Sequence, residues 1–233
     1  SQGAQGPQGG QGGQGTQGPQ GNQGNKGQKG DEAQDGVAGT TKVAILKDQK
    51  NWDIDGGTFT SAGWRDRDLT VEEDPQNFVD FTSGGSQSSA SPGNTPGYWS
   101  LEAGTYRINW SAPGLEVNRH TTKLVWSTTE SQISSAGLHA SASSIVGSCE
   151  NTTHGAEGTA PAQTRSFGSK IITITATTWF KIIHLSSETA SNNGFGRRLG
   201  GSNDGNPPNI YTEVSIEDLS SSVLKGQKGE QGA

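Results

Sequence analysis

The chain has 233 residues, 36 of them glycine, and a formal net charge of −6. This mild acidity argues against a nucleic-acid partner, because phosphate binding requires clustered Lys and Arg side chains. No apolar run reaches the 18 residues that would predict a membrane span. A hydrophobic content of only 27 % raises the alternative of a disordered polar chain, but the modest net charge and the patterned apolar residues argue against it.

Glycine recurs at every third position through residues 1–39, and only Ala33 breaks the period. The glycines in phase are Gly3, Gly6, Gly9, Gly12, Gly15, Gly18, Gly21, Gly24, Gly27, Gly30, Gly36 and Gly39. Only glycine fits at the crowded axis of three intertwined polyproline II strands, whereas a flexible glycine-rich linker would show no phase. The pattern therefore predicts a collagen-like, triple-helical stalk over residues 1–39, with a local loosening at Ala33.

The repeat returns at Gly226, Gly229 and Gly232, which predicts the start of a second collagen-like stalk over residues 225–233. Proline is scarce in both repeats, so polar contacts and ion pairs must stabilise them. We expect Lys29 to pair with Asp31, and Lys228 with Glu230, between staggered neighbouring chains, at about 0.2–1 kcal/mol for each exposed pair. Because the chain opens in mid-repeat, we expect it to be part of a longer protein.

Strand patterns dominate residues 40–224, which we interpret as one head domain. Apolar residues occupy 43–46, alternate with polar ones at 106–110 and 120–126, and fill most of 170–185. A last run places Ile210, Thr212, Val214 and Ile216 on one expected face. Polar clusters at 83–97 and 189–209 separate these runs, and no convincing amphipathic helix is present. Many strands joined by long polar loops predict an all-β sandwich or jelly roll.

A series of short motifs runs through residues 42–219. In chain order they are DGGTFTSAGWRDRDL (55–69), AGTY (103–106), APG (112–114), VNRH (117–120), NGFG (193–196) and IYTEVSIEDL (210–219). Their succession resembles collagen-like structural and tail-fibre proteins of marine, cyanobacterial bacteriophages. The resemblance implies a C1q/TNF-like jelly-roll head, assembled as a homotrimer and flanked by the stalks. It also implies that the first and last strands pair, so that Lys42 and Leu219 approach the same end of the head and the fibre bends back there. The alternative, which we favour because beads on a straight rod suit an appendage, is a rerouted last strand that passes the chain through the head in line.

The resemblance further implies a structural role in a viral fibre or appendage at the surface of the virion, where the head serves host attachment. The expected partners are two further copies of the chain, other virion proteins and a glycan of the host cell surface. An alternative is a secreted bacterial collagen-like adhesin with a C1q-like head. A polysaccharide-degrading enzyme is a third interpretation, because the carboxylates of such enzymes meet only in space. We expect no enzymatic activity.

The sequence predicts no metal, cofactor or catalytic residue. Residues 53–56 (DIDG) begin like a calcium loop, but Trp64 stands where that loop requires a Glu, so we expect an Asp-Gly turn. None of the four histidines, His120, His139, His154 and His184, has a metal-ligand spacing to another. His184 has apolar neighbours and is expected to be a buried core histidine.

Candidate ligand-binding residues are few. Trp52 and Trp99 lie near expected loops and could stack on a sugar ring, although packing in the core or between subunits is an alternative for each. Arg197 and Arg198 are adjacent cations that could bind an anionic glycan, and the alternative is that they solubilise a loop or pair across a trimer. The loops 83–97, 150–163 and 189–209 are the expected recognition sites. Cys149, the single cysteine, is expected to be a small buried residue.

Overall fold

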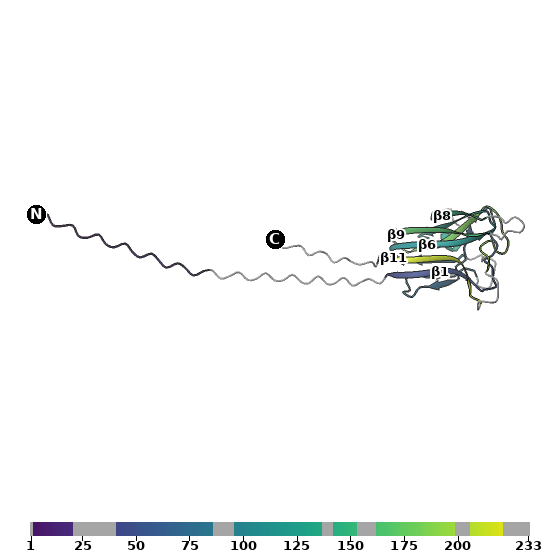
Figure 1. Ribbon diagram of the computed structural model, residues 1–233, viewed down its shortest axis with the longest axis horizontal. Coiled ribbons are helices and arrows are strands. Elements are labelled where there is room, and N and C mark those ends of the chain that lie inside the picture. The colour runs from purple at the N-terminus through teal and green to yellow at the C-terminus, as the bar shows by residue number, and fades with distance from the viewer. Residues whose placement is uncertain are drawn as a thin grey trace. The chain divides into compact units, whose positions relative to one another are not determined.

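The computed structural model describes residues 2–20, 41–85, 96–136, 142–152, 162–198 and 206–220. The contacts within the chain separate it into two units. One unit is residues 36–225, called the head below, and the other is made of the terminal segments 1–35 and 226–233. The elements of the head, drawn in Figure 1, are β1 (Lys42–Lys50), β2 (Arg65–Asp66), β3 (Val71–Glu73), β4 (Asp80–Thr82), β5 (Tyr98–Leu101), β6 (Gly104–Leu115), β7 (Arg119–Ser127), α1 (Ser131–Ser134), β8 (Ser143–Asn151), β9 (Gln163–Ile174), β10 (Thr178–Ser186) and β11 (Asn209–Asp218).

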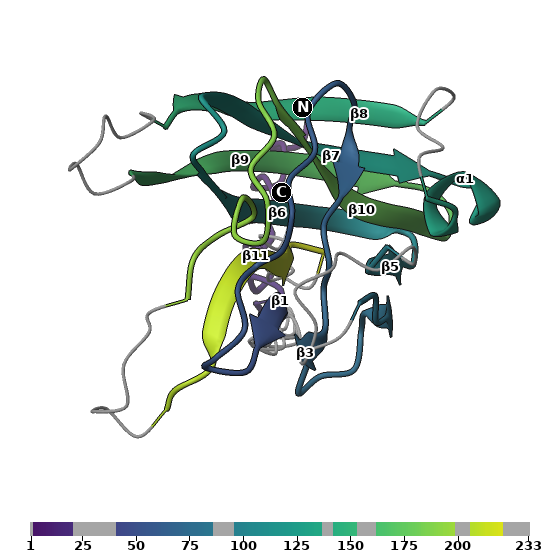
Figure 2. The same ribbon diagram turned by 90° about the vertical axis from the view of Figure 1, so that its right-hand side faces the viewer.

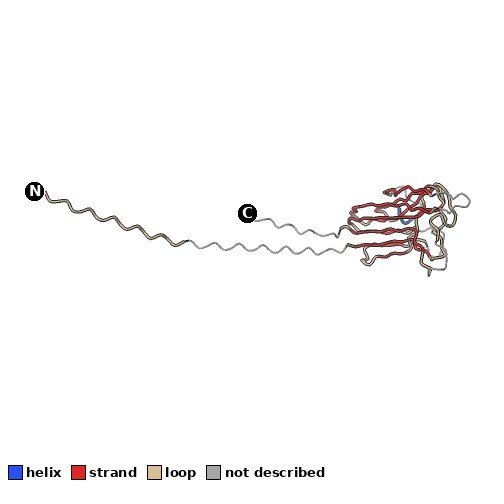
Figure 3. The backbone as a smooth tube through the Cα atoms, viewed as in Figure 1, coloured by secondary structure: helices blue, strands red, loops and turns tan. Residues whose placement is uncertain are grey.

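In the terminal unit, residues 2–20 follow an extended path with neither helix nor strand, and every residue is exposed (Figure 3). The remaining positions of both predicted stalks lie outside the described residues. These positions include Gly21, Gly24, Gly27, Gly30, Gly36, Gly39, Gly226, Gly229, Gly232, Ala33 and the expected ion-pair residues Lys29, Asp31, Lys228 and Glu230.

Two antiparallel sheets form the head. One sheet has five strands in the order β3-β1-β11-β6-β9, which follow one another across the molecule in Figure 2. The other has the order β4-β5-β10-β7-β8, and β2 pairs with β10. From β5 to β7 and from β8 to β11 the chain crosses repeatedly between the sheets, as in a jelly roll. The predicted all-β jelly-roll sandwich is therefore confirmed.

The first and last strands lie side by side. β1 and β11 are antiparallel, with Lys42 opposite Asp218 and Lys50 opposite Asn209. Beyond β11, the backbone N–H of Leu219 donates to the carbonyl of Thr105 at 2.8 Å. The implication that Lys42 and Leu219 approach the same end of the head is confirmed, and the favoured alternative of a rerouted last strand is wrong. This end is called the base below, and the opposite end, where β1 finishes and β11 begins, is called the apex.

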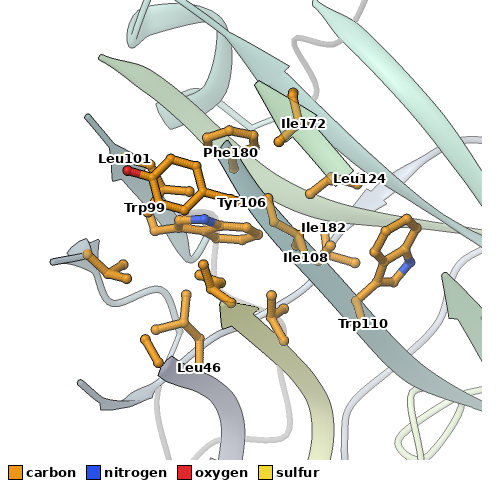
Figure 4. Close-up of a cluster of buried hydrophobic side chains, with 14 of the residues drawn as sticks. Leu46, Trp99, Leu101, Tyr106, Ile108, Trp110, Leu124, Ile172, Phe180 and Ile182 are labelled. Carbon is orange, nitrogen blue, oxygen red and sulfur yellow. The ribbon is translucent and has the colours of Figure 1, made fainter. Parts of the chain in front are cut away.

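The core lies between the sheets. Tyr106, Ile108 and Trp110 on β6 are buried, whereas their neighbours along the strand are only partly buried, so the predicted alternation is confirmed. Figure 4 shows these side chains meeting Leu124 from β7 and Phe180 from β10. Most of the buried apolar residues belong to this one cluster, which agrees with the thin apolar content of the sequence.

The predicted face of β11 is wrong at Ile210. Glu213 lies opposite Lys47 and Ile210 lies opposite Gln49, so two residues of β11 face one residue of β1 between these pairs. Such a bulge reverses the side-chain alternation beyond it. Tyr211 and Thr212 are both buried as a result, and Ile210 points outwards with 41 % of its surface exposed.

The apolar run at 170–185 contributes to two strands. β9 ends at Ile174, residues 175–177 form the turn, and β10 begins at Thr178 in the opposite sheet. The one helix of the described residues, α1, is a single turn with Ile133 buried beneath it. No helix in the described part of the chain is long and apolar enough to cross a membrane.

Candidate functional site

Trp52 lies at the apex on a loop that the fold holds firmly. The side-chain amide of Asn209 donates to the backbone carbonyls of Asn51 at 3.1 Å and of Trp52 at 3.0 Å. The hydroxyl of Tyr211 donates to the carbonyl of Ile54 at 2.7 Å. With its backbone fixed in this way, Trp52 presents an indole that is 39 % exposed.

The two predicted arginines lie beside this loop. The backbone N–H of Arg198 donates to the Asp55 carboxylate at 2.9 Å, and its guanidinium donates to the carbonyl of Asp53. The backbone N–H of Arg197 donates to the side-chain carbonyl of Gln163 at 2.8 Å. Both arginines are exposed. The fold therefore gathers Trp52, Arg197 and Arg198 into one surface at the apex, called the apical surface below.

Residues 53–56 pack against the loop that carries the two arginines, but the turn of this segment lies at Trp52 and Asp53 and not at the expected Asp55-Gly56. The N–H of Gly56 donates to the carbonyl of Gly196 at 2.8 Å. A side chain at position 56 would place its Cβ 2.7 Å from the backbone carbon of Phe195, so the close approach requires glycine. Within the described residues, no group of three His, Cys, Asp or Glu side chains is arranged to hold a metal ion.

The interpretation of Trp99 as a residue that stacks on a sugar is wrong, and the alternative of packing in the core is confirmed. Trp99 belongs to the short strand β5, is fully buried, and stacks on Phe180 at 5.7 Å between ring centroids (Figure 4). β5 lies between β4 and β10, so both of its edges are paired. With its indole inside the core, Trp99 has no face on which a ligand could stack.

The expectation for Cys149 is also wrong, because its side chain is exposed. Cys149 lies on β8, opposite Thr121 of β7, at the edge of the six-stranded sheet. An edge strand is covered on fewer sides than a central strand, so its outward positions stay open to solvent. Of the predicted recognition loops, residues 86–95, 153–161 and 199–205 lie outside the described residues, as do His139 and His154.

Two histidines meet inside the sandwich, which sequence reasoning did not predict. His120 on β7 and His184 on β10 share a hydrogen bond of 2.9 Å, and His120 also contacts the Thr164 hydroxyl at 2.9 Å. Both rings are buried, so the expectation that His184 is a core histidine is confirmed. Phe59 packs against His184, with ring centroids 4.6 Å apart. One indication in the sequence that the two histidines could meet is that both occupy inward positions of strand patterns.

A buried group of charged residues lies next to the histidines. Lys50 contacts Asp48 at 3.2 Å and Asp68 at 3.1 Å, and Arg67 lies 3.7 Å from Asp48. The Arg67 guanidinium also donates to the Thr212 hydroxyl at 2.6 Å. Burial raises the pKa of Asp48 to about 6, although Lys50 and Arg67 lower it. Burial lowers the pKa of Arg67 to about 10, against the opposing effect of Asp48 and Asp68.

These interior groups stabilise one another and are closed to ligands. Burial lowers the pKa of His120 to about 4 and that of His184 well below its ordinary value, so both rings are neutral at pH 7. Since His120, His184 and Arg67 are each at most 1 % exposed, substrate could not reach them. The apical surface is therefore the place where the predicted binding residues could contact a partner.

The comparisons with known proteins concern the fold. No protein-family model matches the chain, and no curated protein matches it in sequence. Among solved structures, murine APRIL at pH 8.5 is similar, with a TM-score of 0.41 and 6 % identity over 77 % of this chain and 100 % of that chain. The globular domain of zebrafish complement 1qA has a TM-score of 0.38 and 10 % identity over 78 % of this chain and 98 % of that chain. These similarities are in the arrangement of strands, and they bear on no ligand or partner.

Proposed function

We propose that the chain is a structural component of a bacteriophage fibre or appendage. Three copies form a collagen-like stalk, and the stalk positions the jelly-roll head at the surface of the virion for attachment to a host. The assembly binds other virion proteins through its ends and a host glycan through its head. In this role the protein catalyses no reaction.

The glycine repeat carries the proposal. Gly3, Gly6, Gly9, Gly12, Gly15 and Gly18 each have open space within 4 Å of the position that a Cβ would occupy. A single chain therefore gives no steric reason for glycine at every third residue. Three chains winding around a common axis give that reason, because only glycine fits at the axis.

The outer face of the five-stranded sheet supports assembly of the head. Val43 on β1 is 40 % exposed, and Phe167 and Ile171 on β9 are 57 % and 55 % exposed. A hollow of about 250 Å³ lies on this face beside Phe167, between it and Glu213. Between Val43 and Ile171 on this face lies the ion pair of Arg107 and Glu217. Exposed apolar side chains favour burial against another protein surface, and the ion pair would lie within such a contact. Further copies of the same chain, held close by the stalk, are the partners that we propose for this face.

Sedimentation equilibrium of the full chain tests the assembly. We expect three times the mass of the 24.2 kDa chain, and a monomer at micromolar concentration would contradict the proposal. Addition of the purified trimer should also inhibit adsorption of the phage to its host. Release of reducing sugars from host envelope would contradict the proposal that the protein is not an enzyme.

Genome context separates this proposal from a secreted bacterial adhesin. Neighbouring capsid or baseplate genes would support a virion protein. A secretion signal encoded upstream of Ser1 would support the adhesin.

A further inference from the structure

A groove opens between the two sheets at the base of the head. Near the middle of the edge strands, the sheets are joined where the Ser166 hydroxyl donates to the carbonyl of Ser148 at 2.7 Å and the N–H of Phe167 donates to the Ser148 hydroxyl at 2.9 Å. Nearer the base, no hydrogen bond joins β8 to β9 among the described residues. A groove of about 710 Å³ lies there, a volume in the usual range for small-molecule sites.

A few apolar side chains lie at the bottom of the groove, whose accessible lining is otherwise mainly polar. Trp126 lies opposite Phe180 of the core and is only partly buried. Ile172 and Ile174 line the facing wall from β9. The indole N–H of Trp126 has no hydrogen-bond partner within the described part of the head, and it is accessible to solvent. An indole of this kind offers a flat apolar face and a free donor to the same ligand.

The rim of the groove is rich in hydroxyl and amide groups. Thr128, Thr129 and Thr175 are exposed at the rim. Gln132 accepts a hydrogen bond from the Ser127 hydroxyl at 2.6 Å through its side-chain oxygen, which leaves its amide N–H groups to donate. Such groups both donate and accept hydrogen bonds, so they suit a ligand that carries several hydroxyls around a ring.

Lys170 gives the groove a preference for negative charge. It lies opposite the buried Ile108, so its side chain leaves β9 on the inner side, and it lines the groove. Among the described residues its ammonium group has no ion-pair partner. The lining contains no Asp or Glu. A partly buried, uncompensated ammonium favours an anionic group on whatever the groove binds.

We propose that this groove binds an acidic sugar residue of a polysaccharide. The apolar face of the ring packs on Trp126, its hydroxyls bond to the rim, and its carboxylate or sulfate contacts Lys170. The site lies at the base and is separate from the apical surface. The biological meaning of this binding rests on the proposed attachment function, whereas the binding itself does not.

The test uses the full chain with oligosaccharides of uronic acids, sulfated oligosaccharides and neutral dextran oligomers, measured by isothermal titration calorimetry. We expect Lys170→Gln to weaken binding of the acidic oligosaccharides about tenfold and to leave neutral ones unchanged. Trp126→Phe, which keeps an apolar ring in the core, should weaken the binding of both acidic and neutral oligosaccharides severalfold.

The matched control is Lys123→Gln, because Lys123 is a partly buried lysine outside the groove, with its ammonium group 4.3 Å from the centre of the Trp64 ring. This control should bind like the wild type. The affinities measured separately for uronic acids and for sulfated sugars show which of the two anionic groups the groove prefers.

Three outcomes would overturn the groove proposal. The first is that no acidic oligosaccharide binds to the wild type. The second is an equal loss of affinity in Lys170→Gln and Lys123→Gln. The third is a change in the sedimenting mass of Lys170→Gln, which would make the groove a contact between copies of the chain. If the wild type is trimeric and inhibits phage adsorption while Lys170→Gln binds the acidic oligosaccharides as tightly as the wild type does, the groove proposal fails alone. If the wild type is neither trimeric nor active in adsorption, the proposed function fails, even when the sugar binding survives.

Discussion

Nδ1 of His120 lies 2.9 Å from Nε2 of His184, and both rings are buried between the sheets. Burial lowers the pKa of both rings, and the charge of Arg67 lowers both further. Glu150, which lies opposite His120 on the neighbouring strand β8, acts against this by raising the pKa of His120. A proton added to either ring would therefore introduce a buried positive charge beside an arginine. Protonation is much easier in the unfolded chain, where the pKa of histidine is about 6.5.

The head should lose stability as the pH falls from about 6.5 towards 4. A histidine whose pKa is lower in the folded state contributes stability that is complete above the unfolded pKa and is lost as the pH falls through the folded pKa. For His120 the loss is on the order of 3 kcal/mol. Because burial raises the pKa of Asp48 to about 6, this carboxylate makes the folded state more stable as the pH falls from 6 to 4. We expect a net loss of stability, since two histidines act against one carboxylate. Urea denaturation at a series of pH values measures the effect.

The variant His120→Gln with His184→Gln is the control for this pH dependence. It should be less stable at pH 7.5, because its amides replace a packed ring pair, but its free energy of unfolding should change less between pH 6.5 and 4. A wild type whose stability is constant over this range would contradict the assignment.

The buried carboxylate of Asp48 should matter far more than an exposed one. Asp48→Ala leaves Lys50 and Arg67 buried with less negative charge beside them, and breaking a buried ion pair in this way costs about 3–5 kcal/mol. The matched control is Glu73→Ala. Glu73 pairs with Lys47 at 2.6 Å, but its side chain is 53 % exposed, so its loss should cost at most about 1 kcal/mol. Similar losses in urea denaturation for both variants would refute the importance of the buried group.

Gly168 should be intolerant of any side chain. It lies opposite Trp110, and a Cβ at position 168 would come within 1.9 Å of the indole. Gly168→Ala should therefore destabilise the head by about 1–3 kcal/mol through overpacking. Gly63→Ala is the matched control, since a Cβ there would meet only Arg65 Nη2 at 4.0 Å. Equal melting temperatures of the two variants would contradict the packing argument.

Local patterns in the sequence predicted much of the sandwich. The alternation of Tyr106, Ile108 and Trp110 predicted which side of β6 faces the core, because a strand with one buried face must alternate. The same rule failed at Ile210, where a bulge adds a residue to β11. Nothing in the local pattern marks that bulge, since it arises from pairing with β1, about 160 residues earlier in the chain.

The candidate sites depended on contacts that the sequence does not reveal. His120 and His184 are 64 residues apart and meet only because β7 pairs with β10 in one register. Trp52 and Arg198 come together through a hydrogen bond to Asp53 that spans 145 residues. For Trp99 the sequence left core packing and ligand binding both open, because β5 has only four residues, too few for a strand pattern to show beside a polar cluster. The groove at Lys170 arises where two edge strands separate, which is a tertiary feature.

A comparison of two adjacent glycines in the stalk separates a triple helix from a single flexible chain. Gly9 is in phase with the repeat and Gly10 is not, yet in one chain both have open space around the position of a Cβ. In a triple helix only Gly9 would face the crowded axis. Gly9→Ala should therefore lower the temperature at which the stalk loses its circular dichroism signal, whereas Gly10→Ala should change it little. The melting of the head, followed by tryptophan fluorescence, should be the same in both. If the two substitutions have equal effects on the stalk, the glycines do not share an axis and the triple-helical stalk is refuted.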